Sequence, residues 1–549
     1  MEPLNMWQRV LIVLIFAYII NVVLEHKSPN LPQENANLVA RFQELREEEA
    51  EKELLPPDNT RIAWLHQKSR NPKVLESVEK ILIKLGLKTI EIDASSVETL
   101  HYDWDFLWSF EPLDSHLSLL NFSKLEFYQK VNHIPGNYRL TSKSILSTRT
   151  LSKYIPRGFL NETNLRNFAR NNPEVRFVEK RTTNRGVTLK NISQIDMSPM
   201  TEDGKKYFAQ VFVEDPFLLD GHKFDFNIYV VITSVDPLRV YYYAKNIYVR
   251  VCKLPYNPND FSELDSYVIS DSFTPGFEFP AIKHYFERGY TFKDAFDMYL
   301  KDRGEDPQKI YDQVEDCIQS TVHAQELVII DRIDSKKARY GKHHFFEMYR
   351  FDFLIDAKLK LHLMEVNLSP NLHAGPKIRH NRHIMESAIY NYLNLVGVGS
   401  YLKSRHIRKF EPDEEDFLVH DNSISVQPEV CMKSPCLNSF SKICDLCVHT
   451  MNGNLKFDLK MAYLEHMNLG DMKRVIPPRN VKTLVQWNFF KYFLNNFAFR
   501  QFSWLMTTTG KDCRLPTNCS QNGASRCARR IEISAKTRNL INWKSSENE

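Results

Sequence analysis

The sequence predicts a mixed α/β and α+β fold, and three observations support this prediction. Arg61–Leu65 and Lys88–Ile92 are short strands that flank a helical pattern over residues 72–85, an order typical of a parallel α/β layer. Phe345–Asp356 and Leu361–Leu368 are two strands separated by a short polar turn, which indicates an antiparallel hairpin. The 549 residues exceed the usual size of one domain, so two or more packed domains are expected.

The composition indicates a folded chain without a large charged field. Hydrophobic residues make up 43% of the chain and aromatic residues 12%, which is enough for a substantial core. The 72 basic and 68 acidic side chains leave a net charge of +4. Because nucleic-acid binding requires a strongly basic surface, the sequence predicts no nucleic-acid partner, and any anionic partner must be held by local patches.

The N-terminal segment predicts a single-pass membrane protein. Val10–Leu24 is an apolar run that, with the residues before it, approaches the ~20 residues needed to span a bilayer. Its end lacks the small residues of a cleavage site, so we assign residues 1–25 to an uncleaved signal anchor and 26–60 to an acidic linker. Basic residues are nearly balanced on the two flanks, which leaves the orientation open. Asn161 begins a glycosylation sequon.

The C-terminal part of the chain, residues 403–549, is rich in cysteine and aromatic residues. Trp487–Trp504 is dense in aromatic residues, and a buried helix or a surface for a membrane or partner both fit this pattern. Disulfides in an oxidising lumen are the preferred interpretation of the cysteines, with a zinc site as the alternative. Seven of the nine cysteines lie in this region: Cys431, Cys436, Cys444, Cys447, Cys513, Cys519 and Cys527.

The predicted hairpin places two carboxylates opposite each other. If the strands pair symmetrically around Ala357 and Lys360, Asp352 faces Glu365, and Asn367 lies two residues further along the same face. Opposed carboxylates repel each other unless a cation neutralises them, and Mg²⁺ prefers oxygen ligands of this kind. A pair of solvated carboxylates on an exposed sheet also fits the pattern, so both interpretations stay open.

Two further segments suggest a site for phosphates. The strand Phe177–Lys180 ends in a lysine and leads into a polar loop with one glycine, whose N–H groups can bind anions, although any arginine-rich turn looks similar. Another strand, from Gly221 to Thr233, carries Lys223, Asp225 and Asn227 on one face. A half-buried strand with a solvated polar side is the alternative for this pattern.

Several motifs occur together and in order, and they identify a family resemblance. Residues 61–402 resemble the tubulin tyrosine ligase-like family of ATP-grasp amino-acid ligases, closest in kind to the tubulin polyglutamylases. This resemblance implies an ATP-grasp catalytic domain over 151–402, preceded by a small α/β domain over 61–150. The matching motifs are Asn132–Gly136, Asp215–Gly221, Lys223–Asp225, Pro237–Tyr241 and Met364–Pro370.

The resemblance also implies an activity, cofactors and partners. A ligase of this kind uses ATP and Mg²⁺ to join free glutamate to a carboxylate of a tubulin tail through an acyl phosphate. Tubulin or microtubules would be the protein partner, and the N-terminal helix would bind the membrane. Because a lumenal domain cannot reach cytosolic tubulin, a lumenal ligase with another substrate remains an alternative.

Site residues follow from the same resemblance. Asp352, Glu365 and Asn367 would bind magnesium, in agreement with the hairpin argument. Positions 223, 227 and 250 form the catalytic set: Lys223, Asn227 and Arg250. The ATP-binding set comprises Lys180, Arg185, Gly186, Gln210, Val211, Phe212, Val213, Lys223 and Asp225.

The chain departs from the family pattern at three places. Asn227 stands where the family usually has an arginine that steadies the reacting phosphoryl group. The phosphate loop has Arg181 in place of a usual proline, and Arg350 replaces a common glycine. Losing a guanidinium that meets developing charge costs several kcal/mol. A catalytically weak or inactive ATP-grasp binding protein is therefore the alternative function, unless Arg185 or Arg250 substitutes.

Overall fold

The computed structural model describes the folded core of the chain. Among the described residues, no helix combines the length and the apolar composition needed to cross a membrane. The predicted anchor, linker, phosphate loop, cysteine cluster and aromatic segment lie outside the described residues. The described residues are 61–67, 75–92, 104–112, 125–126, 128–150, 152–181, 187–195, 207–269, 273–335, 341–370, 372, 379–399, 458, 461–462 and 464–477.

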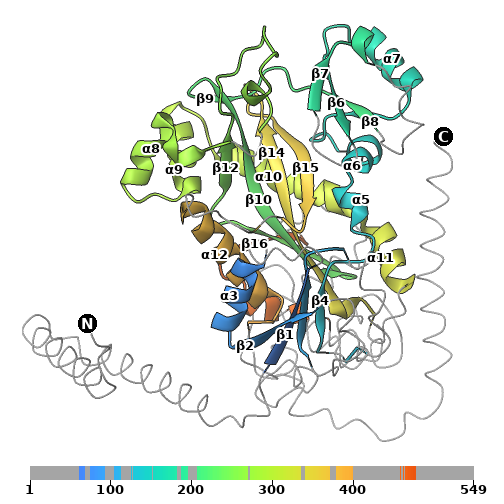
Figure 1. Ribbon diagram of the computed structural model, residues 1–549, viewed down its shortest axis with the longest axis vertical. Helices are drawn as coiled ribbons and strands as arrows, with labels where there is room; N and C mark the ends of the chain where they lie inside the picture. Colours follow the sequence, from blue (N-terminus) through green and yellow to red (C-terminus); the bar gives the residue numbers. More distant parts are fainter. Residues whose placement is uncertain are drawn as a thin grey trace, which may run out of the picture. The chain divides into compact units, whose positions relative to one another are not determined.

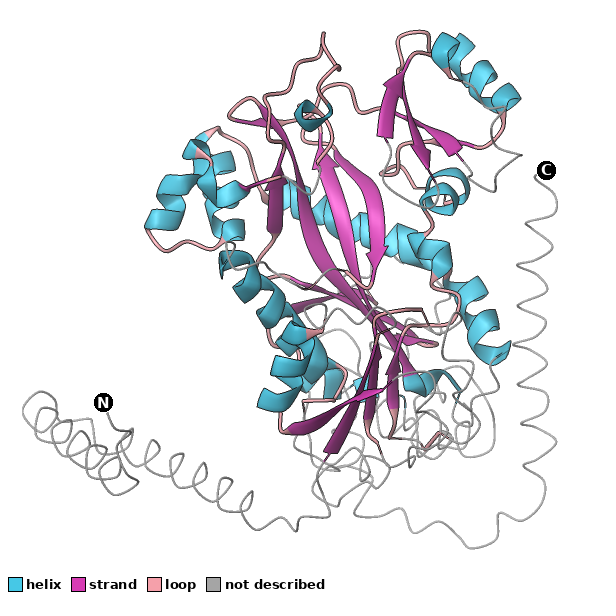
Figure 2. Ribbon diagram, viewed as in Figure 1, coloured by secondary structure: helices cyan, strands magenta, loops and turns pink. Residues whose placement is uncertain are grey.

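Most of the described strands belong to one twelve-stranded sheet (Figures 1 and 2). Its main order is β13-β12-β10-β14-β4-β3-β1-β2, with β9 and β11 on β10, β15 on β14 and β16 on β11. The strands are β1 (Arg61–His66), β2 (Leu87–Ile92), β3 (Phe106–Ser109), β4 (Lys130–Asn132), β9 (Leu218–Leu219), β10 (His222–Val235), β11 (Leu238–Tyr243), β12 (Tyr248–Val251), β13 (Thr274–Pro275), β14 (Phe345–Ile355), β15 (Leu361–Leu368) and β16 (Met472–Ile476).

The first part of the sheet is the predicted parallel α/β layer. β1 pairs in parallel with β3, β3 with β4, and β4 with β14. Helix α3 (Glu76–Lys84) lies within the helical pattern predicted over residues 72–85 and buries Val78, Ile81 and Leu82. Because β4 pairs directly with β14, the sheet continues without a break from this layer into the predicted hairpin.

A second, four-stranded sheet has the order β5-β8-β6-β7 and is antiparallel. Its strands are β5 (Gly158–Phe159), β6 (Phe177–Arg181), β7 (Val187–Lys190) and β8 (Tyr207–Val211). Helix α7 (Glu162–Asn171) packs on it, and Leu165 of α7 lies in a small core with Phe159 and Phe177. Strand β8 ends at Val211, so Phe212 and Val213 of the predicted ATP-binding set follow the strand.

Strand β10 runs through the centre of the large sheet and is buried along nearly its whole length. Its apolar face packs on helix α9 (Phe292–Asp302), where Phe296 contacts Phe224 and Phe226. The polar side chains on the other side of β10 are buried as well, since Lys223, Asp225 and Asn227 are only 6%, 7% and 1% exposed. The alternative interpretation, a half-buried strand with a solvated polar side, is therefore wrong.

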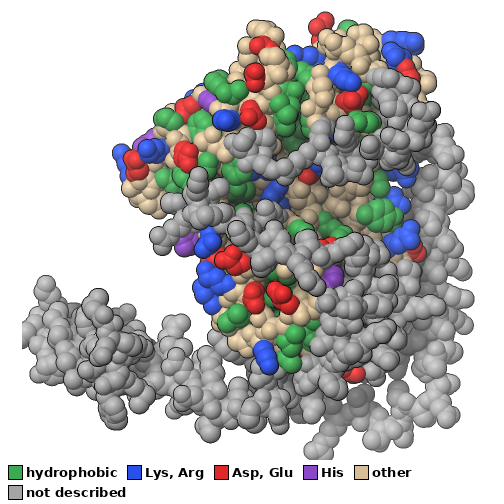
Figure 3. Space-filling model, viewed as in Figure 1, with side chains coloured by type: hydrophobic (Ala, Val, Ile, Leu, Met, Phe, Trp, Pro, Cys, Tyr) green, Lys and Arg blue, Asp and Glu red, His purple; other side chains and the backbone are tan. Residues whose placement is uncertain are grey.

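The remaining helices surround the large sheet (Figure 1). Helix α10 contacts β15 and β16, and both α11 and α12 contact β10. On the face shown in Figure 3, basic and acidic side chains of the described residues are interspersed, in keeping with the small net charge. These helices are α5 (Tyr138–Thr141), α6 (Lys143–Arg149), α8 (Pro280–Glu287), α10 (Gln308–His323), α11 (Glu326–Ser335) and α12 (Arg379–Leu395).

A segment from the C-terminal region completes one edge of the large sheet. Strand β16 pairs antiparallel with β11. Just before it, the buried carboxylate of Glu465 accepts hydrogen bonds from Arg239 Nε at 2.8 Å, Thr233 Oγ1 at 2.9 Å and Tyr241 Oη at 2.8 Å. This part of residues 403–549 is therefore integral to the sheet that carries the predicted ligase residues.

Candidate functional site

The β14–β15 hairpin brings the predicted carboxylates together. Asp352 lies opposite Glu365, as predicted from the symmetric hairpin. The turn itself differs from the prediction, because Asp356 rather than Ala357 lies opposite Lys360, with Asp356 N donating to Lys360 O at 3.0 Å. A register shift beyond Asp352 compensates for the longer turn, so the two carboxylates still meet.

Side chains from four neighbouring strands share one face of the sheet around this pair. Asn227 of β10 lies opposite Asp352 of β14, and Asp225 of β10 lies opposite Arg250 of β12. Residues directly opposite each other in an antiparallel pair point to the same side, as do residues two positions apart in one strand. We call the resulting set the polar face: Asp225, Asn227, Arg250, Arg350, Asp352, Glu365 and Asn367.

Asp352 is the centre of the polar face. Its carboxylate accepts hydrogen bonds from Arg350 Nε at 2.7 Å and Nη2 at 2.8 Å, from Arg250 Nη2 at 3.0 Å and from Asn367 Nδ2 at 3.0 Å. Burial raises the pKa of Asp352, but the Arg350 and Arg250 guanidiniums and the hydrogen bond from Asn367 together outweigh burial and lower it. Asp352 is therefore a buried carboxylate that stays ionised.

Asp225 is held by a second set of contacts on the same face. Arg250 Nε donates to Asp225 Oδ1 at 3.0 Å, and Arg250 Nη2 lies 2.5 Å from Asp225 Oδ2. Asn227 Nδ2 also donates to Asp225 Oδ1, at 2.9 Å. The Oδ1 atom of Asn227 and the hydroxyl of Tyr229 are buried without a hydrogen-bond partner among the described residues. Unpaired buried polar atoms are costly, and they mark a place where a ligand can contribute partners.

Glu365 connects the polar face to residues from the smaller sheet. Its Oε2 lies 3.1 Å from the Nζ of Lys143, the first residue of α6. Lys180, near the end of β6, is half-buried, and its burial lowers its pKa to about 8, while the charge of Glu365 acts in the opposite direction. The predicted lysine of the phosphate strand and the predicted metal carboxylate therefore lie close enough to influence each other.

Lys223 is the second predicted ATP-contacting lysine, and it lies against aromatic rings. Its Nζ is 4.7 Å from the centre of the Phe212 ring and 6.0 Å from that of Tyr256. Burial lowers the pKa of Lys223 to about 8. The amine is still mostly protonated at pH 7, and a nearby phosphate would favour the protonated form further, so Lys223 is suited to anion binding.

Four residues of the predicted ATP-binding set, Gln210–Val213, lie at the end of β8 and directly after it. Gln210 is buried, its Nε2 donates to Pro156 O at 2.8 Å, and its Oε1 has no partner among the described residues. Val211, Phe212 and Val213 line a cavity of about 380 Å³.

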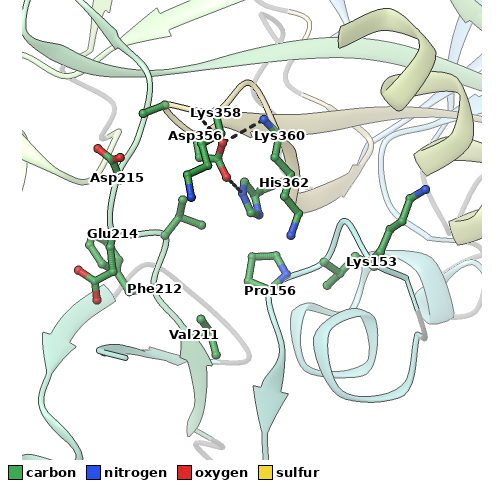
Figure 4. Close-up of a pocket in the computed structure, with 13 residues that line it drawn as sticks. Lys153, Pro156, Val211, Phe212, Glu214, Asp215, Asp356, Lys358, Lys360 and His362 are labelled. Carbon is green, nitrogen blue, oxygen red and sulfur yellow. Dashed lines mark hydrogen bonds and ion pairs between the residues drawn. The ribbon is translucent and has the colours of Figure 1, made fainter. Parts of the chain in front are cut away.

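The opposite side of this cavity is formed by the β14–β15 turn (Figure 4). Its polar lining includes Lys153, Asp356 and His362, with His362 Nε2 2.9 Å from Asp356 Oδ2. Neither Lys180, Lys223 nor the polar face lines the cavity, so it is distinct from the phosphate end of the predicted site. Arg185 and Gly186 lie outside the described residues.

The donor set of the polar face fits a hard cation bound together with phosphates. Within the described part of the chain, no group of three or more His, Cys, Asp or Glu side chains is placed to hold a metal ion. Asp352, Glu365 and Asn367 instead offer two carboxylates and one amide, and Mg²⁺ typically takes one or two carboxylates plus substrate phosphates. These residues therefore suit Mg²⁺ that arrives with a nucleotide.

Two charged residues of this region were not predicted from the sequence as site residues. Arg350 was noted only as a departure from the family pattern, yet it makes the shortest contact with Asp352. Lys143 had no sequence signal, because it precedes the predicted strands by many residues and belongs to no motif. Strand register would have placed Arg350 on the polar face, since it lies two residues before Asp352.

Comparison with known proteins identifies the family of this chain. The sequence pattern of the tubulin-tyrosine ligase family matches residues 121–405, just over half of the chain. This range includes the whole polar face, together with Lys143, Lys180 and Lys223.

Similar curated proteins belong to the same group. "Probable tubulin polyglutamylase ttll-15" of Caenorhabditis elegans is 32% identical over 401 residues, covering 71% of this chain and 75% of that protein. "Tubulin polyglutamylase TTLL6" of Mus musculus is 26% identical, over 55% of this chain and 38% of that protein. "Tubulin monoglutamylase TTLL4" of Mus musculus is 26% identical, over 54% of this chain and 25% of that protein. The chain therefore belongs to the tubulin-tyrosine ligase family, with the ATP-grasp ligase domain of that family in its mixed α/β core.

Proposed function

We propose that this protein is an ATP- and Mg²⁺-dependent ligase that adds glutamate to glutamate side chains of tubulin. The observation that carries the proposal is the buried polar face, in which Asp352 and Asp225 are both bound by Arg250. The names of the similar proteins support tubulin as the acceptor and glutamate as the donor.

The proposed reaction has two steps. A carboxylate does not react with an amine at neutral pH, because its oxygen is a poor leaving group. In the first step, an oxygen of the acceptor carboxylate attacks the γ-phosphorus of ATP, the bond to the β-phosphate oxygen breaks, and ADP leaves. In the second step, the amino group of free glutamate attacks the acyl carbon, phosphate leaves with the bonding electron pair, and the amine loses a proton.

The residues of the site would act mainly by positioning and by balancing charge, which is how most phosphoryl-transfer enzymes work. Lys180, Lys223 and Arg250 would face the phosphates and stabilise negative charge as it moves. When bound by Asp352, Glu365 and Asn367, Mg²⁺ would supply further neutralisation of the phosphate oxygens. Burial of the polar face strengthens all of these interactions by excluding water.

Incorporation of labelled glutamate tests the proposal directly. The full-length protein is incubated with tubulin, ATP, Mg²⁺ and radiolabelled glutamate, and Glu365→Gln serves as the blank. We expect ATP-dependent label on tubulin with the wild-type protein and only background with the variant. Nucleotide binding without any incorporation would refute the tubulin ligase and favour a binding protein or another acceptor.

We also propose that residues 1–25 anchor the protein in a membrane with the ligase core on the cytosolic side, where tubulin is found. Asn161 begins α7 on the exposed surface, and its Oδ1 accepts a hydrogen bond from Asn164 N at 3.2 Å. The protein expressed in its cell should therefore carry no glycan at Asn161. A mass shift on glycosidase treatment that is lost in Asn161→Gln would contradict the cytosolic orientation.

A further inference from the structure

Arg350 lies at the centre of the polar face without an assigned role. Its guanidinium binds both oxygens of Asp352, at 2.7 and 2.8 Å, in a bidentate arrangement. The Arg350 side chain is 12% exposed and that of Asp352 is 6% exposed, so the pair is largely desolvated. A buried ion pair often adds little net stability, so its presence does not by itself assign Arg350 a structural role.

Asp352 is bound by two guanidiniums, and one of them is shared with Asp225. Arg250 Nη2 already lies 3.0 Å from Asp352 Oδ2 and also binds Asp225. Arg250 and Arg350 thus converge on the same oxygen of Asp352. The two guanidiniums balance the carboxylates of Asp352 and Asp225. Arg350 donates only two of its five N–H groups to Asp352, so it retains donors for a further acceptor such as a phosphate oxygen.

The neighbouring strand lacks a cation at this level. Asn227 lies directly opposite Asp352 on β10, and Tyr229 lies opposite Arg350. Both side chains are neutral, and each carries a buried oxygen without a partner among the described residues. The Tyr229 hydroxyl beside Arg350 can donate to a phosphate oxygen, whereas Asn227 Oδ1 can only accept and would need a hydrogen-bond donor or a cation that arrives with the ligand.

We propose that Arg350 is a phosphate-binding residue that contacts the terminal phosphoryl group of the nucleotide. It supplies from β14 the guanidinium that β10 lacks at Asn227. Because Asn227 and Arg350 flank the same carboxylate from adjacent strands, a guanidinium placed at position 227 would reach Asp352 from the other side. This inference rests on the proposed function, since it requires that the site binds ATP.

Comparison of ATP with ADP separates phosphate binding from a structural role. A residue that only neutralises Asp352 stabilises the fold and affects both nucleotides equally. Loss of a residue that contacts the γ-phosphate weakens the binding of ATP but not the binding of ADP. The affinities of the full-length protein for Mg²⁺-ATP and Mg²⁺-ADP are therefore measured by calorimetry for each variant.

We expect Arg350→Gln to weaken ATP binding by about tenfold to a hundredfold, the usual effect of losing a hydrogen bond to a charged group, and to leave ADP binding nearly unchanged. Arg350→Lys should retain part of the preference for ATP, because it keeps the charge without the bidentate geometry. The double variant Asn227→Arg/Arg350→Gln should recover ATP binding. Arg166→Gln on the exposed helix α7 is the matched control and should bind like the wild type.

Three results would overturn the inference. Equal loss of ATP and ADP binding in Arg350→Gln would assign Arg350 a structural role. Unchanged ATP binding in that variant would remove Arg350 from the site. A double variant that does not recover ATP binding would refute the exchange between positions 227 and 350. A wild-type protein that binds neither nucleotide would refute the proposed function itself, and this outcome is distinct from the other three.

Discussion

Replacing Glu465 by alanine would leave Arg239 as an unpaired charge inside the protein. Both side chains are 3% exposed, and the carboxylate accepts two hydrogen bonds from the guanidinium, at 2.8 and 3.0 Å. Thr233 and Tyr241 would lose their acceptor at the same time. Breaking a buried ion pair by removing one partner costs roughly 3–5 kcal/mol. Glu465→Ala should therefore destabilise the protein strongly.

Thermal unfolding measures this effect, with an exposed ion pair as the control. A loss of this size should lower the midpoint by about 5 °C or more. Arg166→Gln removes the surface pair with Glu162 and should change the midpoint by about 1 °C or less. The double variant Arg239→Met/Glu465→Leu should recover part of the loss, because replacing both charges removes the unpaired one. A shift in Glu465→Ala no larger than that of the control would refute the reasoning.

Three further predictions concern charge, metal and backbone. The free Lys223 amine has a pKa of about 8 and must be protonated to bind phosphate, so ATP affinity should fall roughly tenfold between pH 7 and 9.5. Lys223→Arg should flatten this pH profile. A flat profile for the wild-type protein would contradict the prediction. Glu365→Gln should raise the magnesium concentration for half-maximal ATP binding at least about tenfold, and an unchanged titration would count against Glu365 as a ligand. Gly136→Ala should cost about 1–2 kcal/mol of stability by thermal unfolding, because Gly136 has φ +86° and a Cβ would lie 2.9 Å from Arg332 Cγ. Gly304→Ala is the control and should cost less, because Gly304 has a similar φ but open space around the added Cβ. Equal losses in the two variants would rule out a contribution from the clash with Arg332.

The sequence predicted the secondary structure of the core well, because strand alternation and turn length are local properties. The opposition of Asp352 and Glu365 was predicted correctly for a partly wrong reason. The predicted turn paired Ala357 with Lys360, one residue away from the observed pair, and the register shift next to Asp352 brought Asp352 back opposite Glu365. A β-bulge depends on packing around the strand, and no residue in the hairpin indicates where the bulge lies.

The burial of side chains and the pairing of distant segments could not be predicted from local sequence patterns. The alternating polar residues of β10 fit a solvated face equally well, and only the neighbouring strands β12 and β14 show that Asp225 is covered. The contact between Lys143 and Glu365 joins residues more than two hundred positions apart. The pairing of β16 with β11 likewise depends on tertiary structure, because nothing between residues 402 and 472 predicts that the chain returns to the sheet.

The position of β16 has a practical consequence for anyone who expresses a fragment of this protein. A polypeptide that stops at residue 402, where the motif-based boundary lies, would leave β11 as an outer strand with its backbone groups unsatisfied. All six residues of β11, Leu238–Tyr243, are buried in the intact molecule. Such a truncated product invites intermolecular strand addition and precipitation, so soluble recombinant material should extend at least through Ile476.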